Sequence, residues 1–374
     1  MEGPRGTKKN EFGSVMNLVN SVFRPEKKSM QEEYAILFNR ENLENMRIIL
    51  EDGKPVSHAG ISERDIVICG CRSRVGSIGA VCTDPEYRNK GYSTIILKDA
   101  IRKIDRDGAD FMLVSGDRNL YDRLDCMRVG KVCKWTIRKT DLGRLGPSVV
   151  QVRDFARNAL QGMMKVYNRE PVRYIRPVND WNTGVECGQV MNRPCTFATI
   201  YEGRKFRGYV VIHLFDEGTS KIGDVMEYAG SRKALFNAIP SIFKKFNLER
   251  LSFNIPFQDG EFIKSMREKN LNVSVIPVHG TVRIVNFTRL MQRLAPYFRR
   301  RIGRIADSLV FKEENGRFIF ELGRERVIIP NRRVLAWWIL GTPEGYMISG
   351  SGGLENLLGR VFPIPFVWPG MNYV

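Results

Sequence analysis

The chain has 374 residues, of which 43% are hydrophobic, and a formal net charge of +18 at pH 7. This length suffices for two or three domains, each with its own core. There is no run of eighteen or more apolar residues, and residues 1–13 lack the apolar segment of a signal peptide. We therefore expect a cytoplasmic globular protein without a transmembrane segment. The charge permits attraction to nucleic acid, an anionic membrane or a polyphosphate, but it does not choose between them.

The cysteines, histidines and the densest basic cluster give no specific site. The seven cysteines form no C-x-x-C pair, and only three histidines accompany them, so we expect buried thiols and no metal. The Cys69-Gly70-Cys71 pair leaves a redox or metal role open. Residues 298–304, FRRRIGR, lack a zinc finger or an aromatic-rich RNA motif. We interpret this cluster as a solvated helix face or subunit contact, with nucleic acid not expected but not excluded.

The first 140 residues predict a mixed α/β domain. Apolar residues at helical spacing predict helices over residues 11–23 and 30–39, and residues 46–83 resemble consecutive strands joined by an Asp-Gly hairpin turn. A helix to about residue 106, a strand over 109–116, a short helix over 119–127 and a strand over 131–139 follow. Residues 140–148, with two Gly and one Pro, predict a linker.

Residues 84–97, DPEYRNKGYSTIIL, join a strand to a helix through a basic turn. Such a turn gathers backbone N–H groups at the positive end of a helix dipole, where phosphate binds. The sequence contains neither a P-loop nor a complete G-x-G-x-x-G fingerprint here. What remains is R-x-x-G-x-S from Arg88 to Ser93, a pattern that also occurs in turns that contact only solvent.

With this order of elements, residues 46–139 resemble the GNAT superfamily of N-acetyltransferases. In that family, Q/R-x-x-G-x-G/A cradles the pyrophosphate of acetyl-CoA, and Ser93 departs from the usual Gly or Ala. The segment LYDRLDCMRVGKV places Tyr121 where the family has its tyrosine, the candidate general acid. The resemblance implies that backbone amides of the preceding strand hold the pantetheine arm. The implied acetyl-CoA-binding residues are Val81, Cys82, Thr83, Arg88, Asn89, Lys90, Gly91, Tyr92, Ser93 and Thr94.

Residues 150–285 repeat the same order of strands and helices, which indicates an internal repeat. At the position of the basic turn stands EYAGSRKAL, in which Gly230 lacks the preceding R-x-x. We expect a second GNAT-like domain that has lost cofactor binding.

Residues 288–374 predict an amphipathic helix, a strand hairpin with one further strand, and two helices. Two GNAT-like domains followed by a small sterol-carrier-like α+β domain resemble the enhanced-intracellular-survival (Eis) type of acetyltransferase. The expected fold class is therefore α/β (α+β), with domains at 1–145, 146–286 and 287–374. The resemblance also implies a homo-oligomer, which is a hexamer in relatives.

Acetyl transfer to an amine needs a base for the ammonium proton and an acid for the leaving thiolate. Eis-type enzymes use the terminal carboxylate as the base, which here belongs to Val374. Residues 361–374 carry no charged side chain, and burial would raise the pKa of this carboxylate. The alternative is an apolar tail that only fills a core or an interface. Glu32 and Glu33 are conceivable acids of the acceptor pocket or solvated helix residues.

The leading hypothesis is an acetyl-CoA-dependent N-acetyltransferase acting on a primary amine of a small molecule or peptide. Two alternatives remain open: a protein that binds nucleic acid or an anionic surface, and a carrier of an apolar ligand without catalysis. No Ser-His-Asp or Cys-His-Asn arrangement suggests a different chemistry, because the three histidines lie in no nucleophile motif.

Overall fold

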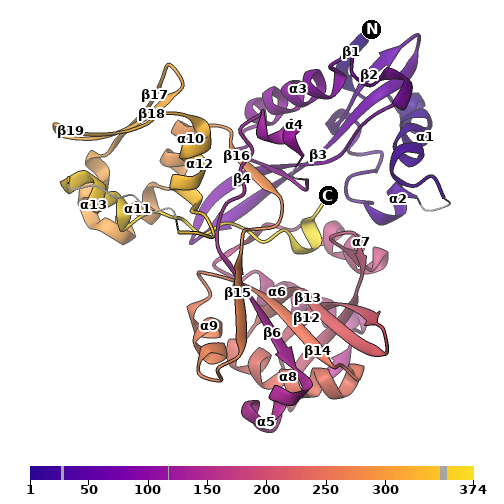
Figure 1. Ribbon diagram of the computed structural model, residues 1–374, viewed down its shortest axis with the longest axis vertical. Helices are drawn as coiled ribbons and strands as arrows, with labels where there is room; N and C mark the ends of the chain where they lie inside the picture. Colours follow the sequence, from indigo (N-terminus) through magenta and orange to yellow (C-terminus); the bar gives the residue numbers. More distant parts are fainter. Residues whose placement is uncertain (27–28, 117, 346–351) are drawn as a thin grey trace.

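The computed structural model describes residues 1–26, 29–116, 118–345 and 352–374. Figure 1 shows three units: one around a seven-stranded sheet at the upper right, one around a second seven-stranded sheet below it, and a smaller lobe at the upper left. The mixed α/β class predicted from the sequence is confirmed.

The first sheet has the strand order β1-β2-β3-β4-β5-β16, and β8 pairs with β3. β4 and β5 run parallel, whereas β3 and β4 form a long antiparallel hairpin. Helix α3 packs on this sheet through Ile96, Leu97, Ala100 and Ile104, whose spacing puts them on one helix face. The strands are β1 (Glu2–Gly6), β2 (Met46–Glu51), β3 (Lys54–Ile68), β4 (Cys71–Thr83), β5 (Phe111–Val114), β8 (Val172–Tyr174) and β16 (Thr281–Ile284), and the helices of this unit are α1 (Phe12–Phe23), α2 (Met30–Glu33), α3 (Tyr92–Arg106) and α4 (Asn119–Asp122).

The second sheet has the order β15-β6-β14-β13-β12-β11-β7. Its strands β13 and β14 run parallel and β12 and β13 antiparallel, which repeats the arrangement around β4. The strands are β6 (Val132–Arg138), β7 (Gln151–Asp154), β11 (Thr196–Glu202), β12 (Lys205–Glu217), β13 (Ser220–Gly230), β14 (Arg250–Pro256) and β15 (Asn272–Ile276), and the main helices are α5 (Leu142–Leu145), α6 (Leu160–Tyr167), α7 (Val178–Cys187), α8 (Arg232–Phe246) and α9 (Gly260–Arg267). A short hairpin, β9 (Gln189–Val190) and β10 (Arg193–Pro194), follows α7.

The two sheets exchange strands, which the sequence did not predict. β6, expected to close the first domain, lies between β14 and β15 of the second sheet. In return, β16 from the second repeat pairs with β5 of the first sheet. The segment 131–139 was therefore correctly predicted as a strand but assigned to the wrong sheet. Its alternating buried residues fit a strand of either sheet, because the alternation specifies only which face of a sheet is buried.

In its described residues, the third unit contains a three-stranded antiparallel sheet and four α-helices. The single helix expected over 288–301 is two helices, because Pro296 cannot donate a backbone hydrogen bond and begins a new helix after Leu294. Arg299 pairs with Asp307, and Arg301 donates to the Arg360 carbonyl, so this basic cluster is engaged within the chain. The elements are α10 (Phe287–Arg293), α11 (Ala295–Ile302), β17 (Val310–Glu314), β18 (Arg317–Leu322), β19 (Glu325–Ile329), α12 (Arg332–Leu340) and α13 (Gly353–Gly359).

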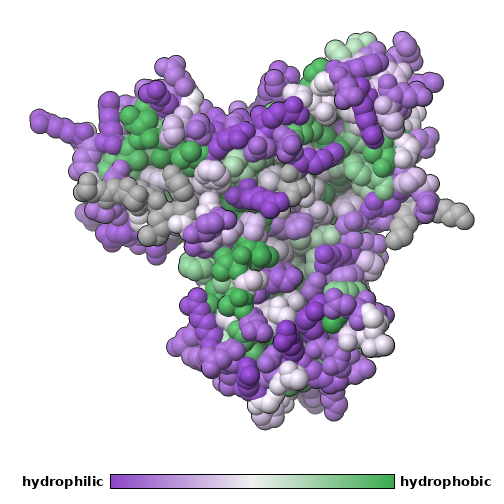
Figure 2. Space-filling model, viewed as in Figure 1, coloured by the Kyte–Doolittle hydropathy of each residue, from purple (hydrophilic) through white to green (hydrophobic). Residues whose placement is uncertain are grey.

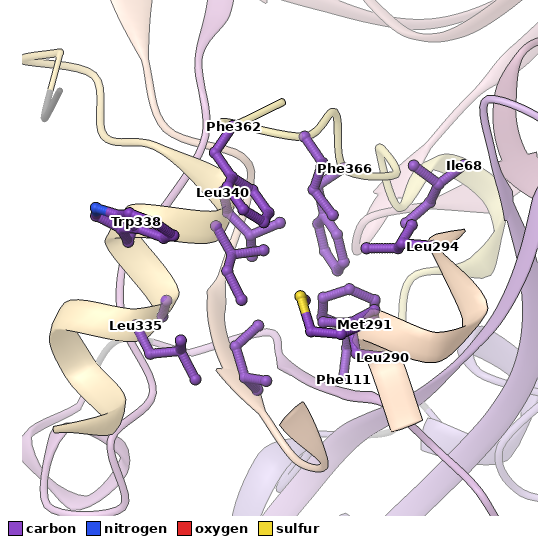
Figure 3. Packing of buried hydrophobic residues seen from close by; sticks show 14 of the residues in the cluster. Ile68, Phe111, Leu290, Met291, Leu294, Leu335, Trp338, Leu340, Phe362 and Phe366 are labelled. Atoms are coloured by element: carbon purple, nitrogen blue, oxygen red, sulfur yellow. The ribbon is translucent and has the colours of Figure 1, made fainter. Parts of the chain in front are cut away.

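One apolar cluster joins the third unit to the first sheet (Figure 3). Phe111 of β5 packs edge to face on Phe366 of the C-terminal tail at 5.0 Å, beside Met291 and Leu294. The tail is thus part of the core. The face in Figure 2 is mainly hydrophilic, with apolar patches between polar ones. Among the described residues, no helix is long and apolar enough to cross a membrane.

The helix predicted over 30–39 is shorter than expected. Only Met30–Glu33 is helical, and the chain then turns so that Leu37 and Phe38 are buried against the first sheet. Leu37 would contact a Cβ placed on Gly60 or Gly79, which shows how closely it packs on β3 and β4. Tertiary packing here outweighs the helical spacing of the sequence.

Candidate active site

The gap between β4 and β5 is the centre of the candidate site. The two strands pair only as far as Ile78 and Val114, while β4 continues to Thr83. The Val81 carbonyl accepts a hydrogen bond from Arg118 at 3.2 Å. In an extended strand the N–H and C=O of one residue point to the same side, so the Val81 backbone faces this gap.

The other two residues predicted to hold the pantetheine arm differ in direction. The Thr83 carbonyl accepts from Nε of Arg88 at 3.5 Å, away from β3. The Cys82 carbonyl instead accepts from the Ser57 hydroxyl of β3 at 3.0 Å. Val81 and Thr83 therefore direct their backbone groups into the gap, and Cys82 directs its carbonyl toward the neighbouring strand.

A bulge in β4 produces this pattern. The register shifts between the pairs His58–Cys82 and Gly60–Gly79, and Ala80 has a φ of 50°. Nδ1 of His58 lies 2.9 Å from the Ala80 carbonyl oxygen. Burial lowers the pKa of His58 to about 4, so the ring is neutral at pH 7 and donates through Nδ1. Sequence reasoning did not select His58, because only the fold brings it to the bulge.

The basic turn is open to solvent and fits an anionic group. Arg88, Asn89, Lys90 and Gly91 are exposed, and Gly91 is the N-cap of α3 with a φ of 80°. A Cβ at Gly91 would meet no described atom within 4 Å, so an approaching group has access to the backbone. The first N–H groups of a helix have no partner within it, and here they are at the positive end of the dipole.

The remaining residues of the turn lie in the first helical turn of α3. Ser93 and Thr94 are half-buried. The Thr94 N–H bonds to the Gly91 carbonyl at 3.0 Å. Tyr92 is buried and donates its hydroxyl to Glu51, so its side chain is engaged with the sheet. Only its backbone remains for a ligand.

The equivalent turn of the second sheet is already occupied by the chain itself. The Gly230 N–H donates to the Glu170 carboxylate at 3.0 Å, and Arg232 pairs with the same carboxylate. Ser231 caps α8 by accepting from the Ala234 N–H. At this turn an acidic side chain of the chain itself therefore bonds the backbone N–H of the glycine.

Tyr121 lies in α4 beside the gap and is 3% exposed. Nη2 of Arg118 donates to its hydroxyl at 3.0 Å, and the guanidinium lies 5.4 Å from the ring centre. Burial raises the pKa of Tyr121, and the charge of Arg118 opposes this. Arg118 therefore links the tyrosine to the Val81 carbonyl. The sequence signal for it, a cation three residues before Tyr121, was not used.

The C-terminal residue reaches the same gap. Val374 is buried, and its carboxyl carbon lies 2.6 Å from the position of a Cβ on Gly79, the first residue of β4 beyond the paired segment. Figure 1 shows the terminus between the first and second units. Burial raises the pKa of Tyr373, the residue before Val374. The two predicted catalytic groups are thus both linked to residues 79–81 of β4, Val374 through Gly79 and Tyr121 through Arg118 and Val81.

The two conceivable acceptor acids have different surroundings. Glu33 forms an ion pair with Arg24. Glu32 is exposed and lines a surface pocket of about 1000 Å³ between residues 29–42 and α7, together with Asp180 and Arg64. Since Asp180 and Arg64 pair with each other at 2.6 Å, this pocket has no strong excess of negative charge.

All seven cysteines are free thiols. Among the described residues, no group of three or more His, Cys, Asp or Glu side chains could hold a metal ion.

Residues 4–128 match the family model of the GNAT acetyltransferase domain, so the first part of the chain is a domain of this class. The whole fold is similar to three solved structures. A probable N-acyltransferase of unknown function from Enterococcus faecalis V583 has a TM-score of 0.69 and 14% identity over 97% of both chains. A GCN5-related N-acetyltransferase from Kribbella flavida has a TM-score of 0.66 and 14% identity over 97% of this chain and 98% of that one.

The third is Eis1 from Mycobacterium abscessus, with a TM-score of 0.61 and 11% identity over 88% of this chain and 85% of that one. No curated protein sequence matches the chain. At these identities, the structural similarity establishes the fold alone.

Proposed function

We propose that the protein is an acetyl-CoA-dependent N-acetyltransferase that acts on a primary amine of a small molecule or peptide. The observation that carries the proposal is that the Val374 carboxyl lies against Gly79 and that Arg118 links Tyr121 to Val81, both on the part of β4 that leads into the open basic turn. The GNAT domain match of residues 4–128 supports acyl transfer in general.

In the proposed reaction, the Val374 carboxylate takes a proton from the acceptor ammonium, and the neutral amine attacks the thioester carbonyl. The C–S bond breaks as the C–N bond forms, and the Tyr121 hydroxyl donates a proton to the CoA thiolate. Arg118 stabilises the transient negative charge on Tyr121, since it already donates to this hydroxyl. The tyrosinate then regains a proton from the nitrogen, which carries one proton more than the amide product needs. The backbone of Val81 and Thr83 holds the pantetheine amides, and the exposed turn of residues 88–94 holds the diphosphate.

The proposal assigns a role to each part of the chain. Residues 1–145 bind acetyl-CoA, residues 146–286 form a GNAT-like unit without a phosphate turn, and residues 287–374 form the sterol-carrier-like unit of an Eis-type enzyme. These are segments of sequence, because the sheets exchange strands: the first sheet includes β8 and β16 from outside its segment, and the second sheet includes β6. The same resemblance extends the proposal to a homo-oligomer, which sedimentation would test.

Isothermal titration with acetyl-CoA, followed by a mass-spectrometric screen of amines, tests the function. We expect one acetyl-CoA per chain and a mass gain of one acetyl group on at least one amine. Two equivalent sites per chain would contradict the assignment of the second repeat. Absence of binding would reject the proposed activity.

A further inference from the structure

The C-terminal tail contacts both sheets at equivalent positions. In the second sheet, β13 and β14 pair as far as Val225 and Phe253, and Nε1 of Trp368 donates to the Met226 carbonyl, the next residue of β13, at 2.7 Å. In the first sheet, the Val374 carboxyl lies against Gly79, again the first residue beyond the paired segment. The tail thus contacts the second sheet through a tryptophan and the first sheet through its carboxyl end.

Between these two contacts, residues 370–372 are held by a buried ion pair. Nη2 of Arg176 pairs with Glu227 at 2.9 Å, with the two side chains 0% and 6% exposed. Oε2 of Glu227 accepts the Met371 N–H at 2.9 Å, and Nε of Arg176 donates to Oδ1 of Asn372 at 2.9 Å. Both charged groups therefore bind the tail as well as each other.

The pair is itself fixed by both sheets. Arg176 follows β8, which pairs with β3 of the first sheet, and its guanidinium lies 4.3 Å from the ring centres of Tyr167 and Trp181. Glu227 belongs to β13 of the second sheet and accepts from the Tyr209 hydroxyl at 2.7 Å. Both side chains are buried, and one follows a strand of the first sheet while the other belongs to the second sheet. The relative position of the two sheets therefore fixes the position of the tail.

Gly370 makes the fit close. Its φ is 47°, and a Cβ there would lie 2.2 Å from Oε2 of Glu227. No side chain fits between this backbone and the carboxylate, so any residue other than glycine must move the tail or the ion pair.

We propose that Arg176 and Glu227 are positioning residues that place the Val374 carboxyl at the β4–β5 gap, and that the second unit serves the reaction by holding the tail. This inference rests on the proposed function, because it gives the second unit a part in the same site. It does not require any ligand in the second gap, where the Trp368 indole contacts the strand edge.

The principal test is Gly370→Ala, with Gly323→Ala as the matched control. Gly323 has a φ of 60° with no described atom within 4 Å of its Cβ position, so the control adds backbone strain without the contact. Two readouts are measured: the rate at which carboxypeptidase A releases Val374, and kcat at saturating acetyl-CoA and acceptor. We expect Gly370→Ala to release Val374 at least about tenfold faster and to lose roughly 10- to 100-fold in kcat, as small misplacements of reacting groups do.

The affinity for acetyl-CoA should stay within about twofold, because the basic turn is untouched. A purely structural role would not separate kcat from acetyl-CoA affinity in this way. Wild-type release and wild-type kcat in folded Gly370→Ala protein would overturn the proposal.

If Gly370→Ala does not fold, the double variant Arg176→Met/Glu227→Gln replaces it. Removing both charges avoids an unpaired buried ion, and the glutamine oxygen can still accept a hydrogen bond. Its control is Arg232→Met/Glu170→Gln, an ion pair of the same unit that bonds Gly230 and Asp259 instead of residues 370–372. We expect faster Val374 release and lower kcat only in the Arg176→Met/Glu227→Gln variant. Equal release rates and equal kcat in the two double variants would overturn the proposal.

The carboxypeptidase assay also tests the positioning of the tail separately from the proposed acetyltransferase function. A wild-type protein that binds no acetyl-CoA would reject the proposed function, yet carboxypeptidase would still report whether Arg176 and Glu227 hold the tail.

Discussion

Gly79 lies directly against the C-terminal carboxyl of Val374: a Cβ on Gly79 would be 2.6 Å from the carboxyl carbon and 2.9 Å from an oxygen. Its φ is not in the left-handed region, so backbone strain does not explain a glycine here. The close approach of the terminus does. The position is thus a direct probe of what the carboxyl contributes.

Gly79→Ala should lower kcat by roughly 10- to 100-fold, because the added methyl displaces the carboxylate from the acceptor amine. Gly60→Ala is the matched control, since the three atoms nearest to its Cβ position all belong to Leu37, which a Cβ at Gly79 would also touch. Steady-state kinetics gives kcat for both variants, and we expect the loss only in Gly79→Ala. Equal losses would assign the effect to Leu37 packing.

Changing the terminal carboxyl itself should also remove activity. Amidation of Val374 by semisynthesis removes the charge with almost no added bulk, and we expect a loss of about 10²- to 10⁴-fold in kcat with acetyl-CoA affinity retained. Deletion of Tyr373 and Val374 should act likewise, and a thermal melt controls for loss of folding. Full activity of the amidated protein would move the search for the base to the acidic side chains of the first unit.

Tyr121→Phe should lower kcat by roughly 10²- to 10⁴-fold and leave acetyl-CoA affinity nearly unchanged. A second variant, Arg118→Met, tests the neighbouring charge. Because Arg118 lowers the pKa of Tyr121, its removal should raise that pKa and shift the high-pH decline of kcat to higher pH. An unshifted pH profile in Arg118→Met, or wild-type turnover in Tyr121→Phe, would exclude this tyrosine as the acid.

Gly91→Val should abolish acetyl-CoA binding, because the side chain occupies the open space where phosphate approaches the backbone. Valine also strains a backbone with positive φ, so Gly218→Val in the β12–β13 hairpin, with a φ of 63° and similarly open surroundings, is the control. Calorimetry compares the two. Normal binding by Gly91→Val would show that this turn is not the phosphate site.

The protein should lose stability through His58 as the pH falls. Burial lowers the pKa of His58 from 6.5 to about 4, so between these values the unfolded chain binds a proton that the folded chain does not. This contribution is complete above pH 6.5 and is lost as the pH falls toward 4, by about 3 kcal/mol in total. Denaturant unfolding of wild type and His58→Asn between pH 7 and 4.5 measures it. Parallel curves would contradict the buried neutral state.

Local sequence patterns predicted most of the helices and strands, and they singled out the basic turn and Tyr121 as candidate site residues. The R-x-x-G-x-S turn and Tyr121 are marked by their neighbours in sequence, so their positions followed from the family resemblance. The Ala80 bulge and its contact to His58 could not be predicted, since they depend on the register between two strands. The Arg176–Glu227 ion pair joins residues that are 51 positions apart, and both bind the tail, so no local sequence pattern could predict these contacts.

The partner of β6 was unpredictable for a related reason. Alternating buried residues specify which face of a strand is buried, but not to which of two similar sheets the strand belongs. Only the complete set of pairings, with β16 crossing in the opposite direction, decides between them.

This crossing orders events during synthesis. The first sheet lacks its edge strand until residues 281–284 have been made, and the β6 strand emerges long before the β14 strand beside which it lies. A nascent chain of 145 residues therefore holds β6 without a partner and β5 with one side open. The last strand of the second sheet, β15, ends at Ile276, and the last strand of the first sheet, β16, ends at Ile284, so the strand sets of both sheets become complete almost together and late in synthesis.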